Sequence, residues 1–273
     1  MIHAVETYKK AQHLDLTGKL VVEMRGHTAL LTLNNPSANT WDAGMLKGVK
    51  QLVEHLNQDQ DIYALVVTGA GEKYFSAGAD LKIFADGDKA KARQMARLFG
   101  EAFEALSNYR GVTIAAINGY AMGGGLECAL ACDIRVAEEQ AQMALPEATV
   151  GLLPCAGGTQ KLSWLVGEGW AKRMILCGER IDARTAERIG LVEEVVAPGQ
   201  ALAKALELAD KVAQQSPVAV RMIKPLIQGA RTQAPDYWLP SEREAFVDLF
   251  DAQDTTEGVS AFLEKRKAQW KNC

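Results

Sequence analysis

The order of short apolar segments restricts the fold of this chain more than any other feature. Apolar, β-prone runs at 19–25 and 28–33 flank Gly26-His27, a pattern typical of a β-hairpin. Residues 42–57 then carry apolar side chains at helical spacing. Because this succession of strands and a helix recurs twice further along, the sequence predicts an α/β fold of repeated strand–strand–helix units.

The remaining predicted elements divide the chain into two regions. Apolar strands are expected at 63–68, 112–117, 133–137 and 142–144, and helices at 88–108, 125–131 and from about 157 onward. After residue 197 helical patterns fill the chain, broken at Pro217, Pro225 and Pro240. We therefore expect residues 1–197 to form the core that carries the active site and residues 198–273 to form a helical region, with no linker between them.

Composition and charge narrow the class of protein. With 48% apolar and 23% charged residues, the chain falls in the ordinary globular range. Its net charge of −4 argues against binding nucleic acid or anionic lipid through the overall field. Residues 1–6 lack the pattern of a secretory signal, and no apolar run has the length of a membrane span, so a cytoplasmic protein is expected.

The cysteines do not form a recognisable metal or disulfide pattern. The five are scattered through a chain too large to need disulfide staples, so reduced thiols are expected. Cys128 and Cys132 lie four apart on a predicted helix, but all four histidines precede residue 56. We therefore expect no zinc site.

Two glycine-rich loops follow predicted strands. Gly123-Gly124-Gly125 leads from a strand into a helix, where unobstructed N–H groups could bind an oxyanion. Close packing of the helix on the sheet explains these glycines at least as well. The segment 75–81, FSAGADL, could direct its own N–H groups to the same point, or it could be a surface turn. Each donor to a thioester oxygen would contribute on the order of 100- to 1000-fold in rate.

Two glutamates lie beside these loops. Glu127 follows the glycine run, and Glu147 comes where a strand ends. An isolated glutamate ordinarily complements a helix dipole or lies in water. Hydration of a conjugated enoyl thioester, however, needs one group that deprotonates water and another that protonates the α-carbon, and a pair of carboxylates can do both.

A basic segment ends the chain. Residues 257–267, EGVSAFLEKRK, place lysine and arginine on a predicted helix, where they could hold phosphates or simply form a solvated face. Phe246, Phe250 and Phe262 are more simply explained as core or subunit contacts.

Taken in order, these segments resemble the crotonase (enoyl-CoA hydratase/isomerase) family. The segments are SAGADLK, INGYAMGGGLECALACDIRVA, LPEATVGLLPCAGGTQKL, CGERIDARTAERIGLV and EGVSAFLEKRK, and the resemblance covers nearly all of the chain after about residue 18. It implies a spiral of ββα units with a C-terminal α-helical region that mediates trimer formation, commonly as a dimer of trimers. Neighbouring subunits would complete the coenzyme A site.

The resemblance also implies roles for individual residues. The backbone N–H groups of Ala79 and Gly124 would form the oxyanion hole, and Glu127 and Glu147 would be the catalytic glutamates. Glu147 would protonate the α-carbon, while Glu127 orients and deprotonates the water. The residues that would contact the coenzyme A thioester are Ala77, Gly78, Asp80, Leu81, Gly123, Phe262 and Lys265.

The expected activity is the reversible syn hydration of trans-2-enoyl-CoA to 3-hydroxyacyl-CoA in fatty acid β-oxidation. Coenzyme A would enter as part of the substrate, with no tightly bound cofactor and no metal. Cys155 stands where the family has glycine, and Met143 and Leu145 replace its aromatic and glutamine positions. These departures leave open the acyl group and the shape of its pocket.

Other activities remain as alternatives. A double-bond isomerase, a hydrolase, a lyase or a hydratase of branched or aromatic enoyl-CoA would reuse the same oxyanion hole, although family isomerases often keep only the later glutamate. A non-catalytic RNA- or CoA-binding homologue is a different class. RNA binding would call for a lysine-rich helix, and residues 47–60 hold only two lysines.

Overall fold

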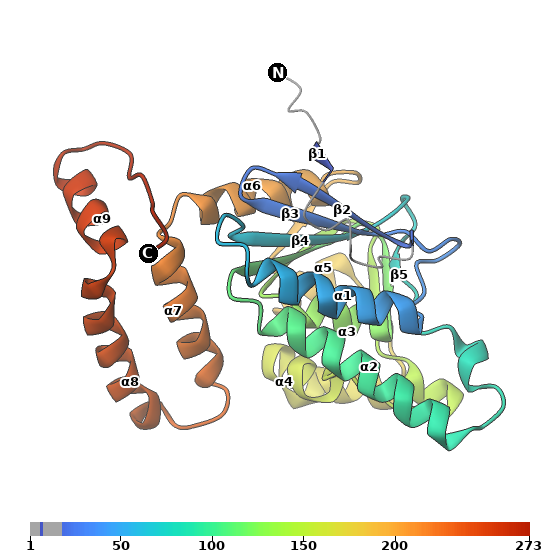
Figure 1. Ribbon diagram of the computed structural model, residues 1–273. Helices are drawn as coiled ribbons and strands as arrows, with labels where there is room; N and C mark the ends of the chain where they lie inside the picture. The colour runs from blue at the N-terminus through green and yellow to red at the C-terminus, as the bar shows by residue number, and fades with distance from the viewer. Residues whose placement is uncertain (1–5, 8–17) are drawn as a thin grey trace.

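The computed structural model describes residues 6–7 and 18–273 (Figure 1). The sequence evidence against a secretory signal falls mainly on residues 1–5, which lie outside the described residues, as do His3 and His13. In the described part of the chain, no helix combines the length and the hydropathy that crossing a membrane requires.

A seven-stranded sheet forms the centre of the fold. Its order is β1-β2-β3-β4-β6-β8-β11, with β1 and β2 antiparallel to their neighbours and the other strands parallel. The strands are β1 Glu6–Thr7, β2 Leu20–Arg25, β3 Thr28–Leu33, β4 Ala64–Gly69, β6 Val112–Ile117, β8 Ile134–Glu138 and β11 Glu194–Val196. The predicted hairpin and the predicted strand at 112–117 are thereby confirmed.

A smaller sheet of four short strands carries the loops of the candidate site. Its order is β10-β9-β7-β5, comprising β10 Ile181–Asp182, β9 Gln142–Ala144, β7 Tyr120–Met122 and β5 Tyr74–Ser76. The sequence analysis did not predict β5 or β7. Each contains only three residues, too few for an alternating pattern to be recognised.

Helices cover both faces of the large sheet. They are α1 Ala43–Leu56, α2 Lys89–Ser107, α3 Gly124–Ala131, α4 Gly158–Leu176, α5 Ala183–Arg188 and α6 Ala201–Ala213, with 3-10 turns η2 Leu81–Phe84 and η3 Glu147–Val150. Leu31, Leu65 and Ala115 face the main core with α1 and α2, whereas alternate strand residues pack on Ala205 and its neighbours in α6. Burial on both faces explains why these strands are continuously apolar.

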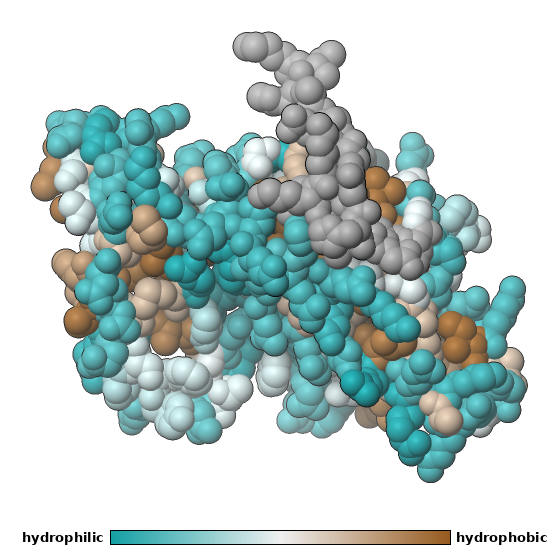
Figure 2. All heavy atoms as spheres, viewed as in Figure 1, coloured by the Kyte–Doolittle hydropathy of each residue, from teal (hydrophilic) through white to brown (hydrophobic). Residues whose placement is uncertain are grey.

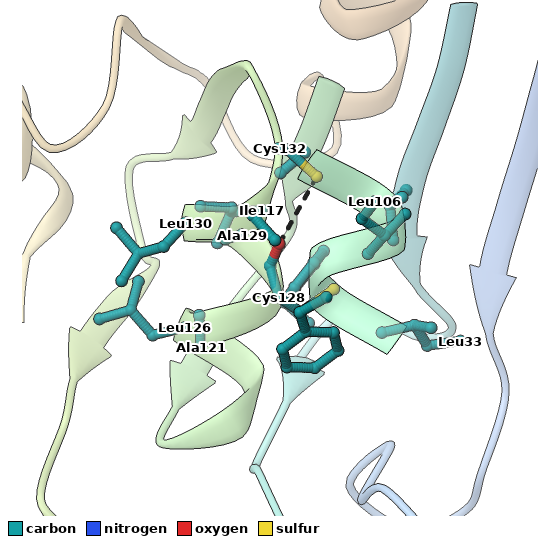
Figure 3. Packing of buried hydrophobic residues seen from close by; sticks show 14 of the residues in the cluster. Leu33, Leu106, Ile117, Ala121, Leu126, Cys128, Ala129, Leu130 and Cys132 are labelled. Carbon is teal, nitrogen blue, oxygen red and sulfur yellow. Dashed lines mark hydrogen bonds between the residues drawn. The ribbon is translucent and has the colours of Figure 1, made fainter. Parts of the chain in front are cut away.

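The catalytic candidate Glu127 lies on a helix that is buried throughout. Every residue of α3 is buried, and Figure 3 shows Cys128 on the side of α3 that faces Leu106 of α2, with Leu126 and Leu130 on the opposite side. Burial raises the pKa of the Cys128 and Cys132 thiols, and Cys132 Sγ donates to the Cys128 carbonyl at 3.5 Å. Rigid packing around α3 fixes the position of its first turn.

The C-terminal region consists of helices that project from the core (Figure 1). They are α7 Pro217–Gly229, α8 Pro235–Asp248, the 3-10 turn η4 Leu249–Asp251 and α9 Gln253–Leu263. The prediction that Pro225 and Pro240 break helices is wrong, because α7 and α8 continue through them. A proline removes one helical hydrogen bond, and contacts on both sides offset that loss in α7: Lys224 Nζ donates to the Tyr109 carbonyl at 2.7 Å, and Gln228 Nε2 to the Ser107 carbonyl at 3.0 Å.

Candidate active site

Both glycine-rich loops and both glutamates border one cavity of about 540 Å³. Its volume lies in the range of small-molecule sites. The lining residues are Ala77, Gly78, Ala79, Leu81, Phe84, Ala92, Ala96, Phe99, Met122, Gly123, Gly124, Glu127, Pro146, Glu147, Thr149, Val150, Gly151, Leu152, Leu153 and Cys155. The structure thus brings together the predicted catalytic residues from segments far apart in the sequence.

The two glycine-rich loops lie against each other. A β-carbon on Gly78 would be 2.7 Å from the Met122 carbonyl oxygen and 3.2 Å from the Gly124 nitrogen. Gly78 has a φ of +90° and Gly123 a φ of +52°, both in the region that favours glycine. Glycine at these positions therefore allows the two loops to pack closely, and this packing is also what brings them to one point.

The geometry leaves the N–H groups of Ala79 and Gly124 available to the cavity. Trp41 N donates to the Gly78 carbonyl at 2.8 Å, and Asp80 N to the Trp41 carbonyl at 3.4 Å. The Gly78 carbonyl and the Ala79 N–H belong to one peptide, and in a trans peptide these two groups point in opposite directions. Because the Gly78 carbonyl points toward Trp41, the Ala79 N–H points away from it. Gly124 begins α3, where N–H groups have no helical partner and carry the positive end of the dipole.

Glu127 is held by backbone donors. Only 3% of the residue is exposed, and its Oε1 accepts from Ala156 N at 2.7 Å and Gly158 N at 2.9 Å. Burial raises the pKa of Glu127, and these two bonds oppose the rise. A β-carbon on Gly158 would lie 2.9 Å from Oε1, so glycine is needed for this contact. The second oxygen, Oε2, is the one that remains for a water or substrate.

Glu147 has a different environment. It begins the turn η3, and its buried Oε2 has no hydrogen-bond partner within the described chain. Burial raises the pKa of Glu147 to about 7, and the charge of Glu127 contributes to the rise. An ordinary carboxyl group has a value of 4.5. Near neutral pH this carboxyl group can therefore hold a proton and donate it. A glutamate in water would be ionised at that pH and could not.

The rest of the wall is apolar. From η2 and α2 come Leu81, Phe84 and Phe99, with the small side chains of Ala92 and Ala96 between them. Leu152 and Leu153 also line the cavity and are 42% and 67% exposed. Figure 2 shows brown, hydrophobic residues on the side of the molecule near η2. The sequence analysis missed this wall, although small residues four apart on an amphipathic helix were a signal for it.

The three residues that depart from the family pattern differ in whether they line the cavity. Cys155 lines the cavity beside the glutamates, and burial together with their charges raises its pKa to about 11. The thiol is therefore neutral at physiological pH. Met143 and Leu145, expected to reshape the acyl pocket, are fully buried and do not line the cavity. Leu145 packs behind Glu127, with Cδ1 3.0 Å from the position of a β-carbon on Gly158.

Three predicted substrate contacts do not line this cavity. Asp80 caps η2, with Oδ1 accepting from Lys82 N at 3.1 Å. Phe262 lies on α9 and is 83% exposed, and Lys265 follows the end of that helix with a φ of +56°. Figure 1 shows α9 on the side of the molecule opposite to the start of α2. Within one chain, Phe262 and Lys265 are thus apart from the glutamates.

Comparison with known proteins agrees with this arrangement. Residues 23–273 match the family model described as enoyl-CoA hydratase/isomerase. The short-chain-enoyl-CoA hydratase of Clostridium acetobutylicum is 38% identical over 92% of this chain and 96% of its own length. The 2,3-dehydroadipyl-CoA hydratase of Escherichia coli is 39% identical over 93% of this chain and 98% of its own length.

A solved structure extends the comparison to the fold. The structure of Pseudomonas aeruginosa DspI superimposes with a TM-score of 0.94 at 75% sequence identity, covering 96% of this chain and all of that one. The crystal structure of an enoyl-CoA hydratase from Bacillus anthracis superimposes with a TM-score of 0.90 at 36% identity, covering 93% of this chain and all of that one, and it confirms the predicted crotonase-like α/β fold. The chain belongs to the enoyl-CoA hydratase/isomerase family.

Proposed function

We propose that this protein hydrates trans-2-enoyl-CoA thioesters reversibly to 3-hydroxyacyl-CoA. The observation that carries the proposal is the meeting of Glu127 and Glu147 in one cavity with the N–H groups of Ala79 and Gly124. The two carboxyl groups have unequal environments, which suits one base and one acid.

In the proposed reaction, the thioester carbonyl oxygen accepts hydrogen bonds from Ala79 N and Gly124 N. Glu127 takes a proton from a water molecule held at its free oxygen, and the hydroxide adds to the β-carbon. The electron pair of the double bond moves to the thioester oxygen as an enolate. Glu147 then delivers its proton to the α-carbon on the same face, so that the substrate gains one water. The proton taken up by Glu127 returns to Glu147 through solvent before the next turnover.

The cavity wall favours a neutral, aliphatic acyl group. Among the described lining residues, the only charged side chains are the two glutamates. An acyl chain that ends in a carboxylate would be repelled and would find no cation in the wall. We therefore infer fatty enoyl-CoA substrates, as in β-oxidation, rather than a dicarboxylic one such as the Escherichia coli relative's name indicates.

The position of α9 supports an assembly in which subunits share the coenzyme A site. Phe246, Phe250 and Phe262 are 63%, 65% and 83% exposed on the C-terminal helices. Burying one such side chain contributes about 1.5 to 3 kcal/mol. We propose that a second copy covers these side chains in a trimer or a dimer of trimers, bringing Phe262 and Lys265 to a neighbour's substrate. Light scattering after gel filtration tests the assembly.

Loss of enoyl absorbance with crotonyl-CoA and longer enoyl-CoAs tests the reaction. Glu127→Gln and Glu147→Gln should each keep the fold and lose most of the rate. Product analysis by mass spectrometry separates hydration, which adds one water, from double-bond isomerisation, which leaves the mass unchanged. No turnover of any enoyl-CoA by the wild-type protein would refute the proposal.

A further inference from the structure

A second cavity, of about 460 Å³, lies between α7 and the core, at the C-terminal end of α3. Trp164 on α4 and Ile223 and Ile227 on α7 line it and are 48%, 48% and 65% exposed. Leu130 and Ile134 complete the apolar part of the wall. The volume suits a small molecule, and the wall shares no residue with the cavity that holds the glutamates.

The acidic side chain of this wall is already neutralised. Asp133 Oδ2 lies 2.7 Å from Lys224 Nζ and accepts from Thr113 N at 2.8 Å and Thr113 Oγ1 at 2.9 Å. Lys224 Nζ also donates to the carbonyls of Tyr109 and Gly111. This cluster attaches α7 to the core. The Asp133 carboxylate is occupied by these contacts and does not pair with the other positive charges in the cavity.

Two further cations in the wall have no carboxylate partner in the part of the chain that the structure describes. Lys161 Nζ donates to the Ser107 hydroxyl, and the Arg231 guanidinium lies 5.6 Å from the centre of the Trp164 ring. Burial lowers the pKa of Lys161, and the positive charge of Arg231 lowers it further. An anion between these side chains would relieve both effects.

We propose that this second cavity binds an aliphatic monocarboxylate, with its carboxylate between Lys161 and Arg231 and its tail along Trp164 and Ile223. Charge complementarity selects the head group, because three cations and one paired carboxylate leave the wall positive. The apolar side chains exposed on α4 and α7 select the tail. A free fatty acid has this chemistry, whereas a coenzyme A thioester lacks the terminal carboxylate.

Titration with octanoate tests the site in the complete protein. The substrate cavity is first saturated with octanoyl-CoA, a saturated thioester that has no double bond to hydrate. Octanoate should then give saturable heat in calorimetry and a change in tryptophan fluorescence. Trp164→Phe should remove most of the fluorescence change while the heat remains. Octanol, which keeps the tail without the charge, should bind at least about tenfold more weakly.

Charge-removing variants locate the carboxylate. Lys161→Met and Arg231→Gln should each weaken octanoate binding at least about tenfold, since a charged hydrogen bond contributes about 1.5 to 3 kcal/mol. Lys172→Met, on the same helix and paired with Glu168 at 2.7 Å, is the control and should bind normally. Arg231 is exposed at the rim, so its variant should fold and hydrate crotonyl-CoA like the wild type even if Lys161→Met is unstable.

Four results would overturn this proposal. The absence of a saturable octanoate signal would show that there is no such site, and displacement of the signal by octanoyl-CoA would place it in the substrate cavity. Binding that is unchanged in Arg231→Gln would show that these cations do not form the site. Loss of the native oligomer in Arg231→Gln, without any octanoate binding by the wild type, would show that a second copy of the chain fills the cavity.

Discussion

A β-carbon on Gly123 would lie 3.2 Å from Oε1 of Glu147. The glycine run therefore contacts the proposed acid as well as the loop of Gly78. This relationship connects the oxyanion donors to the proton donor through one short backbone segment. It also shows that position 123 has little room for a side chain, which the sequence alone did not reveal.

Gly123→Ala should impair both folding and catalysis. The φ of +52° strains any side chain, and the new methyl group would press on Glu147. We expect a loss of about 1 to 3 kcal/mol in unfolding free energy and a fall in kcat of more than about tenfold. Gly87→Ala is the matched control, because its φ is +68° with no atom within 4 Å of the β-carbon. Urea unfolding and turnover measurements on both variants test this prediction. Equal kcat values for the two variants would contradict the contact between Gly123 and Glu147.

Glu147→Gln should become more stable relative to the wild type as the pH rises. Above pH 4.5 the unfolded carboxyl group is ionised, whereas the folded one keeps its proton until about pH 7. The wild type therefore loses stability through this interval, by at most about 3 kcal/mol, and the glutamine variant does not. Thermal melts at pH 5 and pH 8 measure the difference, with Glu242→Gln on exposed α8 as control. A pH-independent difference would refute the raised pKa.

Ala96→Phe should shorten the range of acyl chains accepted. Ala96 lines the apolar wall of the cavity, and a phenyl ring there would occupy space that we assign to the acyl tail. We expect crotonyl-CoA turnover to persist while kcat/KM for octenoyl-CoA falls at least about tenfold. Ala90→Phe, on the same helix and outside the cavity, should leave the profile unchanged. An equal loss for both substrates would place the tail elsewhere.

Cys155 should be slow to alkylate, although part of the residue is exposed to solvent. With a pKa of about 11, roughly one thiol in a thousand is ionised at pH 8. Iodoacetamide labelling, followed residue by residue in mass spectra, should accelerate up to pH 10. Saturation with octanoyl-CoA should protect the residue, since it lines the substrate cavity. Rapid labelling at pH 7 would contradict the neutral thiol.

The sequence predicted the framework of the fold better than the environment of the site. Apolar runs located β6 to the residue, because a strand buried on both faces leaves an unbroken signal. The three-residue strands β5 and β7 leave none. Glu127 and Glu147 were found through motif order, but the backbone donors Ala156 and Gly158 reach Glu127 only through tertiary packing. The raised pKa of Glu147 likewise depends on burial that the adjacent residues do not encode.

The pH dependence of crotonyl-CoA hydration tests the division of labour between the glutamates most directly. Glu147 must hold a proton to donate it, and its pKa is about 7. The value of kcat/KM should therefore fall above an apparent pKa near 7, by about tenfold for each further pH unit. A profile that stays level from pH 6 to pH 9 would contradict the role of Glu147 as the proton donor.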